Sequence, residues 1–183
     1  NRLISDVSKA SRLDRELALQ ETEPLDFSEL VRGMVTVLSD IHSDRGCKIT
    51  LNLASGPSDG KLYMVRGHEG RLGQVMTNLV DNALSFSPDG GEVAVTVSRV
   101  GADIVTTIDD QGPGIPPDRL EHVFKRFYSD RPQSDQTLGK NSGLGLSITR
   151  EIVRAHGGDV IAENRPLVAG AAPSPALRPE LEE

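Results

Sequence analysis

The sequence lacks several features that would point to particular classes of protein. It has no tryptophan, two tyrosines and four phenylalanines among 183 residues. The single cysteine, Cys47, excludes an internal disulfide framework and a cysteine-based zinc site. No apolar run approaches the roughly 20 residues that cross a bilayer. The net charge of −7 argues against nucleic acid as the main partner, because phosphate binding needs a concentrated basic face.

What is present describes an ordinary globular chain. Apolar residues make up 37% of the sequence and charged residues 26%, a balance that is not typical of disorder. The length predicts one domain with tails or an appendage. Because the chain begins at Asn1 rather than Met, we expect it to be a piece of a longer protein.

Three parts follow one another along the chain. Residues 1–22 are predicted to be a helical stub and linker, since apolar residues recur there at helical spacing. Asp26 and Glu29 form an aspartate version of the capping box near the start of the main domain, which we place at residues 23–165. Residues 166–183 hold prolines and alanines and are predicted to be a flexible tail.

The main domain changes repeatedly between helical and strand patterns. The predicted elements are a helix opened by Asp26, strands at 48–53 and 61–65, a long helix at 69–86, a hairpin of strands at 92–100 and 103–109, a short helix at 116–124, a helix at 144–155 and a last strand at 159–162. Strands grouped in hairpins, with helices between and after them, predict an α+β fold with a two-layer α/β sandwich.

A polar stripe lies beside the apolar face of the 69–86 helix. At about 100° per residue, Asn78 and Asn82 fall one turn apart and point the same way. Their carboxamide oxygens are hard ligands, which suit Mg²⁺ bound together with nucleotide phosphates. A solvated helix face that carries asparagine by chance is the alternative interpretation.

Two glycine-containing segments are further candidates. Asp110 is followed by Gly112 and Gly114, which let a ligand approach the backbone closely, and Asp110 itself could accept a hydrogen bond from an amine such as that of adenine. Segment 139–146 (GKNSGLGL) runs into the 144–155 helix, whose free N–H groups and dipole favour a phosphate. A plain turn and a flexible connector are the alternatives.

The order and spacing of these motifs are specific, although each motif alone is weak. Asn82 within DNA, then DxGPG, then a phenylalanine-containing segment around Arg126, then GxNSGLGL resemble the N, G1, F and G2 boxes of the histidine-kinase ATP-binding domain. That family shares a superfamily with gyrase B, Hsp90 and MutL. The wording of residues 126–132 and 141–148 also resembles ChvG/ExoS-type sensor kinases. The resemblance implies a Bergerat-type sandwich, with a mixed sheet covered by helices on one face.

The resemblance implies a role for each matching residue. Asn78, Asn82 and Arg126 are the expected catalytic residues, and the two asparagines, Asn82 above all, are the expected Mg²⁺ ligands. Phe86 is expected against the adenine ring, whose amino group Asp110 would recognise. The expected nucleotide-binding residues are Asn78, Asn82, Phe86, Asp110, Gly112, Gly114, Ile115, Gly139, Ser142, Gly143, Leu144, Gly145 and Leu146.

Some features depart from the family pattern. Ser85 stands where many relatives carry a lysine that contacts phosphate. Residues 170–175 are rich in proline where the family has its last strand, so we expect that edge of the sheet to be missing or replaced. None of the four histidines has the wording of the phosphoacceptor helix, and the acceptor is therefore expected outside this chain.

The resemblance implies a protein-histidine kinase that uses ATP and Mg²⁺. It would transfer the γ-phosphate to a histidine on a dimerisation hairpin, for relay to an aspartate of a response-regulator receiver domain. A homodimer through that hairpin is implied, as is a cytoplasmic domain of an inner-membrane sensor, attached through segments outside this chain. The fragment alone is expected to lack autophosphorylation. A clamp-type ATPase, a serine kinase of the anti-sigma type and a non-catalytic module that senses ATP stay open as alternatives.

Overall fold

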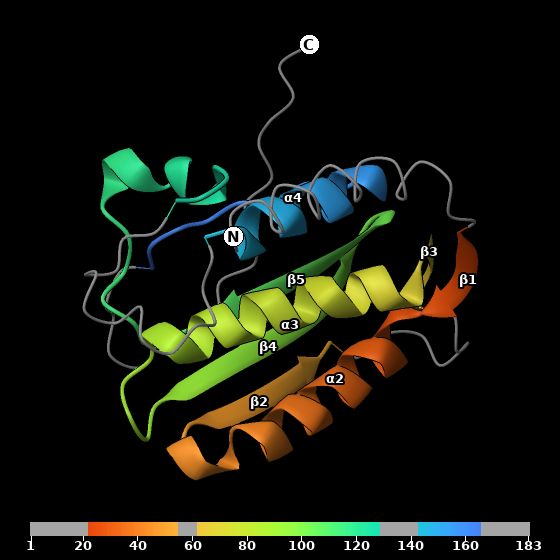
Figure 1. Ribbon diagram of the computed structural model, residues 1–183. Coiled ribbons are helices and arrows are strands. Elements are labelled where there is room, and N and C mark those ends of the chain that lie inside the picture. The colour runs from red at the N-terminus through yellow and green to blue at the C-terminus, as the bar shows by residue number, and fades with distance from the viewer. Residues whose placement is uncertain (1–21, 55–61, 129–142, 166–183) are drawn as a thin grey trace, which may run out of the picture.

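The computed structural model describes residues 22–54, 62–128 and 143–165. Within these ranges the α-helices are α2 (Phe27–Ile41), α3 (Glu69–Phe86) and α4 (Gly145–Ala155). The strands are β1 (Glu23–Asp26), β2 (Lys48–Leu53), β3 (Met64–Gly67), β4 (Glu92–Val100) and β5 (Asp103–Asp109). Short 3-10 turns are η1 (Ser43–Arg45), η2 (Pro117–Arg119) and η3 (His122–Phe124). Figure 1 shows these elements in place.

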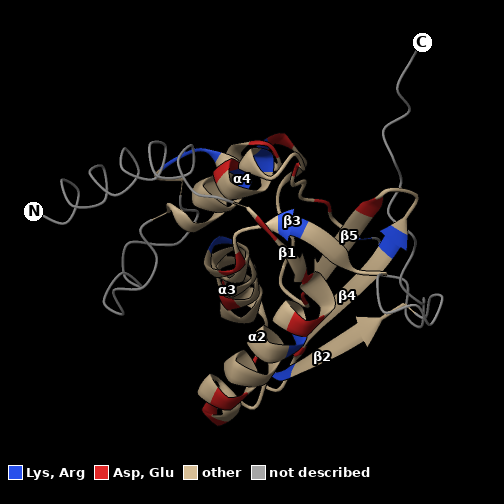
Figure 2. Cartoon of the chain, turned by 90° about the vertical axis from the view of Figure 1, so that its right-hand side faces the viewer, with Lys and Arg blue, Asp and Glu red and all other residues tan. Residues whose placement is uncertain are grey.

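The main sheet is mixed, with strand order β2-β4-β5. β2 runs parallel to β4, with Lys48 opposite Glu92, and β4 runs antiparallel to β5, with Ala94 opposite Asp109. A separate antiparallel pair joins β1 to β3. Seen from the side in Figure 2, the helices form one layer and the β2-β4-β5 sheet forms the other. The α+β sandwich predicted from the sequence is confirmed.

The core lies between this sheet and the helices α2 and α3. Buried positions alternate along β4 and recur at helical spacing on α3. Side chains in this core that are at most 1% exposed include Val93, Val95 and Val97 of β4 and Met76, Val80 and Leu84 of α3. Full burial of one such side chain contributes about 1.5–3 kcal/mol. These contacts fix α3 firmly against the sheet.

A smaller apolar contact joins α3 to α4. Val75 of α3 and Ile152 of α4 are buried there, and Leu79, Ile148 and Val153 pack around them. Helix α3 therefore has a core face toward the sheet and a second contact face toward α4, and it joins α4 to the sheet.

The ends of the helices match the expected signals. The Asp26 carboxylate accepts hydrogen bonds from the Ser28 and Glu29 N–H groups at 2.9 and 3.4 Å, which confirms the start of α2. The hydrogen bond from the Ser28 hydroxyl is the main cause that lowers the pKa of Asp26. After α4, Gly157 takes the left-handed conformation with φ 81°, as its glycine cap predicts.

The structure differs from the predicted elements at four places. Strand β1 was not predicted, because Pro24 was expected to interrupt regular structure. Proline is nevertheless tolerated in an edge strand such as β1. β3 begins at Met64 rather than at residue 61, and the predicted 116–124 helix is two 3-10 turns. Residues 159–162 are not a strand, and Asp159 instead directs its carboxylate to arginines of α4.

Several predictions fall outside the described residues. They are the helical stub at 1–22 apart from Thr22, the tail at 166–183, the proline-rich stretch at 170–175, and Gly139 and Ser142 of the glycine-rich segment. In the part of the chain that the structure describes, no helix has the length and apolar content needed to cross a membrane.

Candidate functional site

One end of the candidate site is the junction of α3 with the start of α4. The Asn78 amide nitrogen donates to the Gly145 carbonyl at 3.2 Å and to the Thr149 hydroxyl at 3.4 Å. The Asn78 side chain therefore ties α3 to the first turns of α4. Leu144, the residue before α4, is buried but makes no side-chain capping hydrogen bond, and the first turn holds no acidic residue. The positive end of this helix carries no anionic side chain of its own.

Asn82 lies one turn farther along α3 and is half-buried. Its side chain makes no hydrogen bond to the described residues, and its carbonyl accepts one from the Ser85 hydroxyl at 2.7 Å. Asn78 and Asn82 thus differ, because the first amide is engaged between two helices and the second is available to a ligand. The shared direction of the pair follows from helix geometry, but this division of roles required the tertiary structure.

The other end of the candidate site lies where α3 ends beside the turn after β5. A Cβ atom added to Gly112 would lie 3.1 Å from the Cβ and carbonyl oxygen of Phe86 and 2.7 Å from an Asp110 carboxylate oxygen. Glycine is therefore required for this close approach. The Asp110 carboxylate accepts the Gly112 N–H at 2.8 Å, while Asp110 and Phe86 both stay exposed.

An asparagine that sequence reasoning missed holds the next part of this turn. Asn164 accepts the Ile115 N–H at 2.8 Å and donates to the Ile115 carbonyl at 2.5 Å. Gly114, with φ 77°, brings the backbone into this position. Because Asn164 lies 49 residues away in sequence, no local signal could have pointed to it.

The segment before the glycine-rich loop is joined directly to the segment after it. The Phe127 N–H donates to the Gly143 carbonyl at 3.0 Å. Gly143 has φ 69°, and a Cβ atom there would lie 2.7 Å from the Tyr128 carbonyl oxygen. Phe127 itself has φ 65°, an unusual value for a residue other than glycine. The two ends of the loop are thus held together by backbone contact.

Arg126 pairs with a carboxylate on α4. Its Nε and Nη2 atoms both donate to one oxygen of Glu151, at 3.0 and 2.6 Å. The second Glu151 oxygen is buried and has no hydrogen-bond partner among the described residues. Arg126 is therefore directed along α4 rather than toward its first turn.

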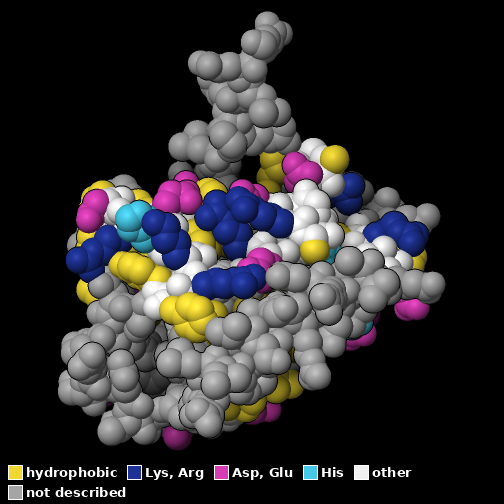
Figure 3. Space-filling view, turned by 45° about the horizontal axis from the view of Figure 1, so that its top comes forward, with side chains coloured by type: hydrophobic (Ala, Val, Ile, Leu, Met, Phe, Trp, Pro, Cys, Tyr) yellow, Lys and Arg dark blue, Asp and Glu magenta, His cyan; other side chains and the backbone are white. Residues whose placement is uncertain are grey.

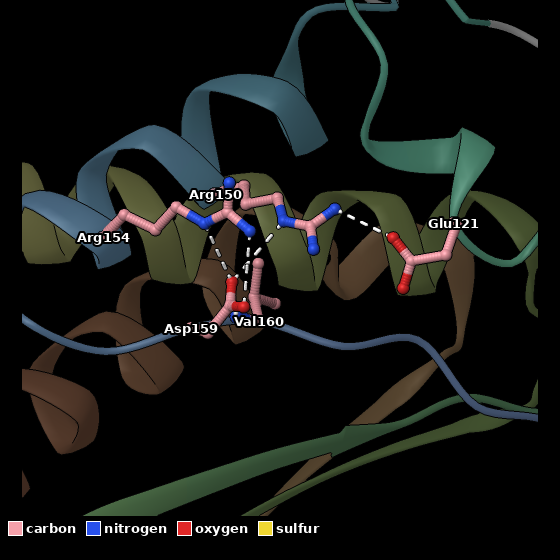
Figure 4. A network of polar contacts seen from close by, with 5 residues as sticks. All are labelled: Glu121, Arg150, Arg154, Asp159 and Val160. Atoms are coloured by element: carbon pink, nitrogen blue, oxygen red, sulfur yellow. Dashed lines mark hydrogen bonds and ion pairs between the residues drawn. The ribbon is translucent and has the colours of Figure 1, made fainter.

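A second ion-pair network fixes the outer side of α4 (Figure 4). Arg150 donates to Glu121 at 3.1 Å and lies 4.9 Å from the centre of the Phe124 ring. Arg154 donates to Asp159 at 3.2 Å, and this hydrogen bond is the main cause that lowers the pKa of Asp159. Figure 3 shows basic side chains gathered on the side of the molecule that carries α4, among acidic ones. This network ties α4 to the turns before it and the segment after it.

Asp109, beside Asp110, is the titratable group of this region with a raised pKa. Burial is the main cause of the rise, and the nearby Asp110 adds to it. Arg165 acts in the opposite direction, since its Nε lies 2.8 Å from one Asp109 oxygen. The other oxygen is buried without a hydrogen-bond partner among the described residues. Asp109 is therefore part of the support beneath the turn, while Asp110 is its exposed carboxylate.

The donor set decides how the site could bind a metal. Among the described residues, no group of three His, Cys, Asp or Glu side chains could hold a metal ion. Mg²⁺ usually needs only one or two protein oxygens together with substrate phosphates and water. The Asn82 amide oxygen fits that pattern, and Asn78 offers an oxygen on the same side of α3.

The structure thus brings half of the predicted site residues together at two places. Asn78, Leu144 and Gly145 meet at the α3–α4 junction, with Leu146 in the first turn of α4. Phe86, Asp110 and Gly112 meet at the end of α3. About 12 Å of helix separates Asn78 from Phe86, at about 1.5 Å per residue.

Comparison with known proteins identifies this arrangement. The family described as "Histidine kinase-, DNA gyrase B-, and HSP90-like ATPase" matches residues 67–172. The chain belongs to this family. The matched range includes α3, the turn after β5 and the start of α4, so the two groups of residues described above both lie within the ATPase region.

Relatives of this chain include sensor proteins. The chain is 43% identical over 166 residues to sensor protein ChvG of Agrobacterium fabrum and 41% identical over 169 residues to ChvG of Rhizobium meliloti. Each alignment covers 90% of this chain but only 28% and 29% of the relatives, so the chain spans less than a third of their length.

Solved structures of histidine kinases have the same fold. The catalytic domain of histidine kinase ThkA matches with a TM-score of 0.67 at 26% identity, over 80% of this chain and 90% of that one. Full-length ShkA in complex with AMPPNP matches with a TM-score of 0.59 at 27% identity, over 78% of this chain and 29% of that one. The resemblance to histidine kinase catalytic domains, and to the ChvG type, is confirmed.

Proposed function

We propose that residues 23–165 bind ATP with Mg²⁺ and transfer the γ-phosphoryl group to a histidine. Residues 1–22 would be the end of a dimerisation hairpin and residues 166–183 a tail. The observation that carries the proposal is the position of α3, whose middle and C-terminal end meet chemically different groups: the start of α4 beside Asn78, and an exposed carboxylate beside Phe86. An elongated ligand with a base at one end and phosphates at the other suits this layout.

The adenine end would use Asp110 and Phe86. The Asp110 carboxylate already accepts the Gly112 N–H with one oxygen, which sets its orientation and leaves the other oxygen for the adenine amino group. Gly112 lets the backbone approach α3 closely, and the exposed Phe86 side chain offers an apolar surface for the ring. Gly114 and Ile115 would shape the pocket, held by Asn164.

The phosphate end would use the first turn of α4. Among the described residues, no side chain caps its N–H groups and no acidic residue stands in the first turn, so an anion can accept hydrogen bonds from these N–H groups. Gly143, Gly145 and Leu146 would present these groups, together with Gly139 and Ser142 of the loop. When bound through Asn82 and Asn78, Mg²⁺ would neutralise charge on the phosphates. The protein would thus act mainly by positioning and by charge stabilisation.

The rest of the reaction would need parts outside this chain. We propose that the acceptor histidine lies on a dimerisation hairpin, that the hairpin makes the full-length protein a homodimer, and that an aspartate of a response-regulator receiver domain takes the phosphoryl group next. We also propose that the domain is cytoplasmic and is held at the inner membrane by other segments. The name that these relatives carry, sensor protein, supports a place in a sensing system.

The test combines binding with phosphoryl transfer. The 183-residue chain would be incubated with labelled ATP and Mg²⁺, with and without a separately purified hairpin that carries an acceptor histidine. We expect an acid-labile, alkali-stable phosphate on the hairpin, and none without it. Phosphate release with no phosphoprotein would favour a clamp-type ATPase, and binding without turnover would favour an ATP-sensing module.

A pair of aspartate variants tests the adenine end. Asp110→Asn is expected to weaken ATP binding at least tenfold, because a hydrogen bond to a charged group contributes about 1.5–3 kcal/mol. Asp118→Asn, which removes an exposed carboxylate from η2, is the matched control and should leave the affinity unchanged. Equal affinities of the two variants would contradict the assignment of Asp110.

A further inference from the structure

The Arg126 backbone is fixed next to the start of α4. On one side, the Lys125 N–H donates to the His122 carbonyl at 2.9 Å, and on the other the Phe127 N–H donates to the Gly143 carbonyl at 3.0 Å. Gly143 lies two residues before α4 begins. A change in the direction of Arg126 therefore requires its side chain to rotate, while its backbone stays next to Gly143.

The Arg126 side chain contacts Glu151, six residues into the helix from Gly145. At about 1.5 Å per residue, this carboxylate lies roughly 9 Å along the axis from the first turn. The side chain therefore follows α4 away from the end that is expected to face phosphate. Its Nε and Nη2 atoms donate to the same carboxylate oxygen, at 3.0 and 2.6 Å.

This ion pair is poorly matched for a permanent structural contact. A guanidinium and a carboxylate bind best through two parallel hydrogen bonds, one to each oxygen. Here the second Glu151 oxygen is buried and has no partner among the described residues. The Arg126 and Glu151 side chains are 41% and 28% exposed, so water screens the attraction.

We propose that Glu151 is the internal counterion that holds Arg126 along α4 until nucleotide phosphates compete for it. Glu151 is then a positioning residue, which acts through Arg126 and lowers the apparent affinity for ATP. The inference rests on the proposed function, since it needs a phosphate ligand at the start of α4. Its chemistry is an exchange of partners: the guanidinium leaves a carboxylate and pairs with a phosphate oxygen, and no covalent bond changes.

The experiment measures the dissociation constant of ATP with Mg²⁺, by calorimetric titration of the 183-residue chain. Glu151→Gln is expected to tighten binding about threefold, because an exposed ion pair of this kind is weak. Arg126→Gln is expected to weaken binding about tenfold. In the double variant the gain from Glu151→Gln should vanish, since no guanidinium is left to be released.

Glu121→Gln is the matched control. It also removes one negative charge close to α4, but its partner is Arg150 rather than Arg126. We expect it to leave the affinity for ATP unchanged. Glu151→Asp, which keeps the charge and shortens the side chain, should give an intermediate gain. Thermal melting of each variant would verify that the fold is intact.

The outcomes separate this proposal from the proposed function. If the wild-type chain bound no ATP, the proposed function would fall, and this inference with it. If the wild type bound ATP but Glu151→Gln weakened binding or left it unchanged, Glu151 would be a structural partner only. An equal gain from Glu151→Gln in the Arg126→Gln background, or from Glu121→Gln, would show a general charge effect and would also overturn the inference.

Discussion

His156 joins the end of α4 to the start of α3, and its replacement gives a sharp test of the structure. Its Nε2 atom accepts the His68 backbone N–H at 3.1 Å, and its Nδ1 atom lies 2.7 Å from the Ile152 carbonyl. Because a backbone N–H only donates and a carbonyl only accepts, the proton of the ring must be on Nδ1. One ring thus bridges two helices through opposite roles of its nitrogens.

His156→Ala is expected to destabilise the domain by about 2–3 kcal/mol. The His68 N–H is half-buried and would lose its acceptor, and an unpaired buried donor costs about 1–3 kcal/mol. The lost ring also packs closely, since a Cβ atom on Gly67 would lie 2.9 Å from its Cδ2 atom. For a chain of this size about 1 kcal/mol corresponds to about 2–4 °C. The melting temperature should therefore fall by about 5–10 °C.

The assay is thermal unfolding of the 183-residue chain, followed by far-ultraviolet circular dichroism. His122→Ala removes an exposed histidine from η3 and serves as the matched control, with an expected change below about 1 °C. His156→Gln retains one acceptor and one donor and should recover part of the loss. A melting temperature for His156→Ala equal to that of His122→Ala would refute the bridging role.

Three further substitutions test other parts of the domain. Gly143→Ala should cost about 1–2 kcal/mol in urea unfolding and should weaken ATP binding, since φ is 69° and the new Cβ would meet the Tyr128 carbonyl; an unchanged protein would mean that the loop adapts freely. Burial raises the pKa of Asp109, so the folded state binds that proton more tightly than the unfolded state. Ionisation of Asp109 as pH rises from about 4 toward 7 therefore destabilises the wild type relative to Asp109→Asn. Melting curves at several pH values should show the melting temperature of the wild type falling relative to that of Asp109→Asn as pH rises, and a constant difference would contradict this. Tyr63→Phe removes the hydroxyl that donates to the Ala54 and Val97 carbonyls. Chemical denaturation should show the free energy of unfolding lowered by about 1–2 kcal/mol, and an unchanged value would mean that water satisfies these carbonyls instead.

Local patterns predicted the elements whose signals are complete within a short segment. The bounds of α3, β2, β4 and β5 match the predicted ranges, because each combines a regular apolar period with clear stop signals. The start of α2 was found from Asp26, whose capping bonds reach only two and three residues ahead. The prediction for 159–162 was wrong, since strand propensity there competes with ion pairs to α4 that the sequence does not reveal.

In the candidate site, too, some residues were predicted from local motifs and others were found only from contacts between distant segments. The motifs placed Asn78, Asn82 and Asp110 on the correct elements, because these residues lie within recognisable segments. The motifs did not reveal Asn164, which clamps the backbone of Ile115. Nor did they reveal that Glu151 pairs with Arg126, because the contact joins positions 25 residues apart.

The sequence by itself determined most of the helices and strands and which residues are candidates for a nucleotide site. Those features follow from side-chain periodicity, capping and glycine placement, all of which act over a few residues. Only the tertiary structure decided the division between Asn78, whose amide binds across two helices, and Asn82, whose amide makes no such bond to the residues that the structure describes. It also decided where Arg126 is directed. Hydrogen bonds and ion pairs between distant segments depend on how helices pack, and packing is a property of the whole core.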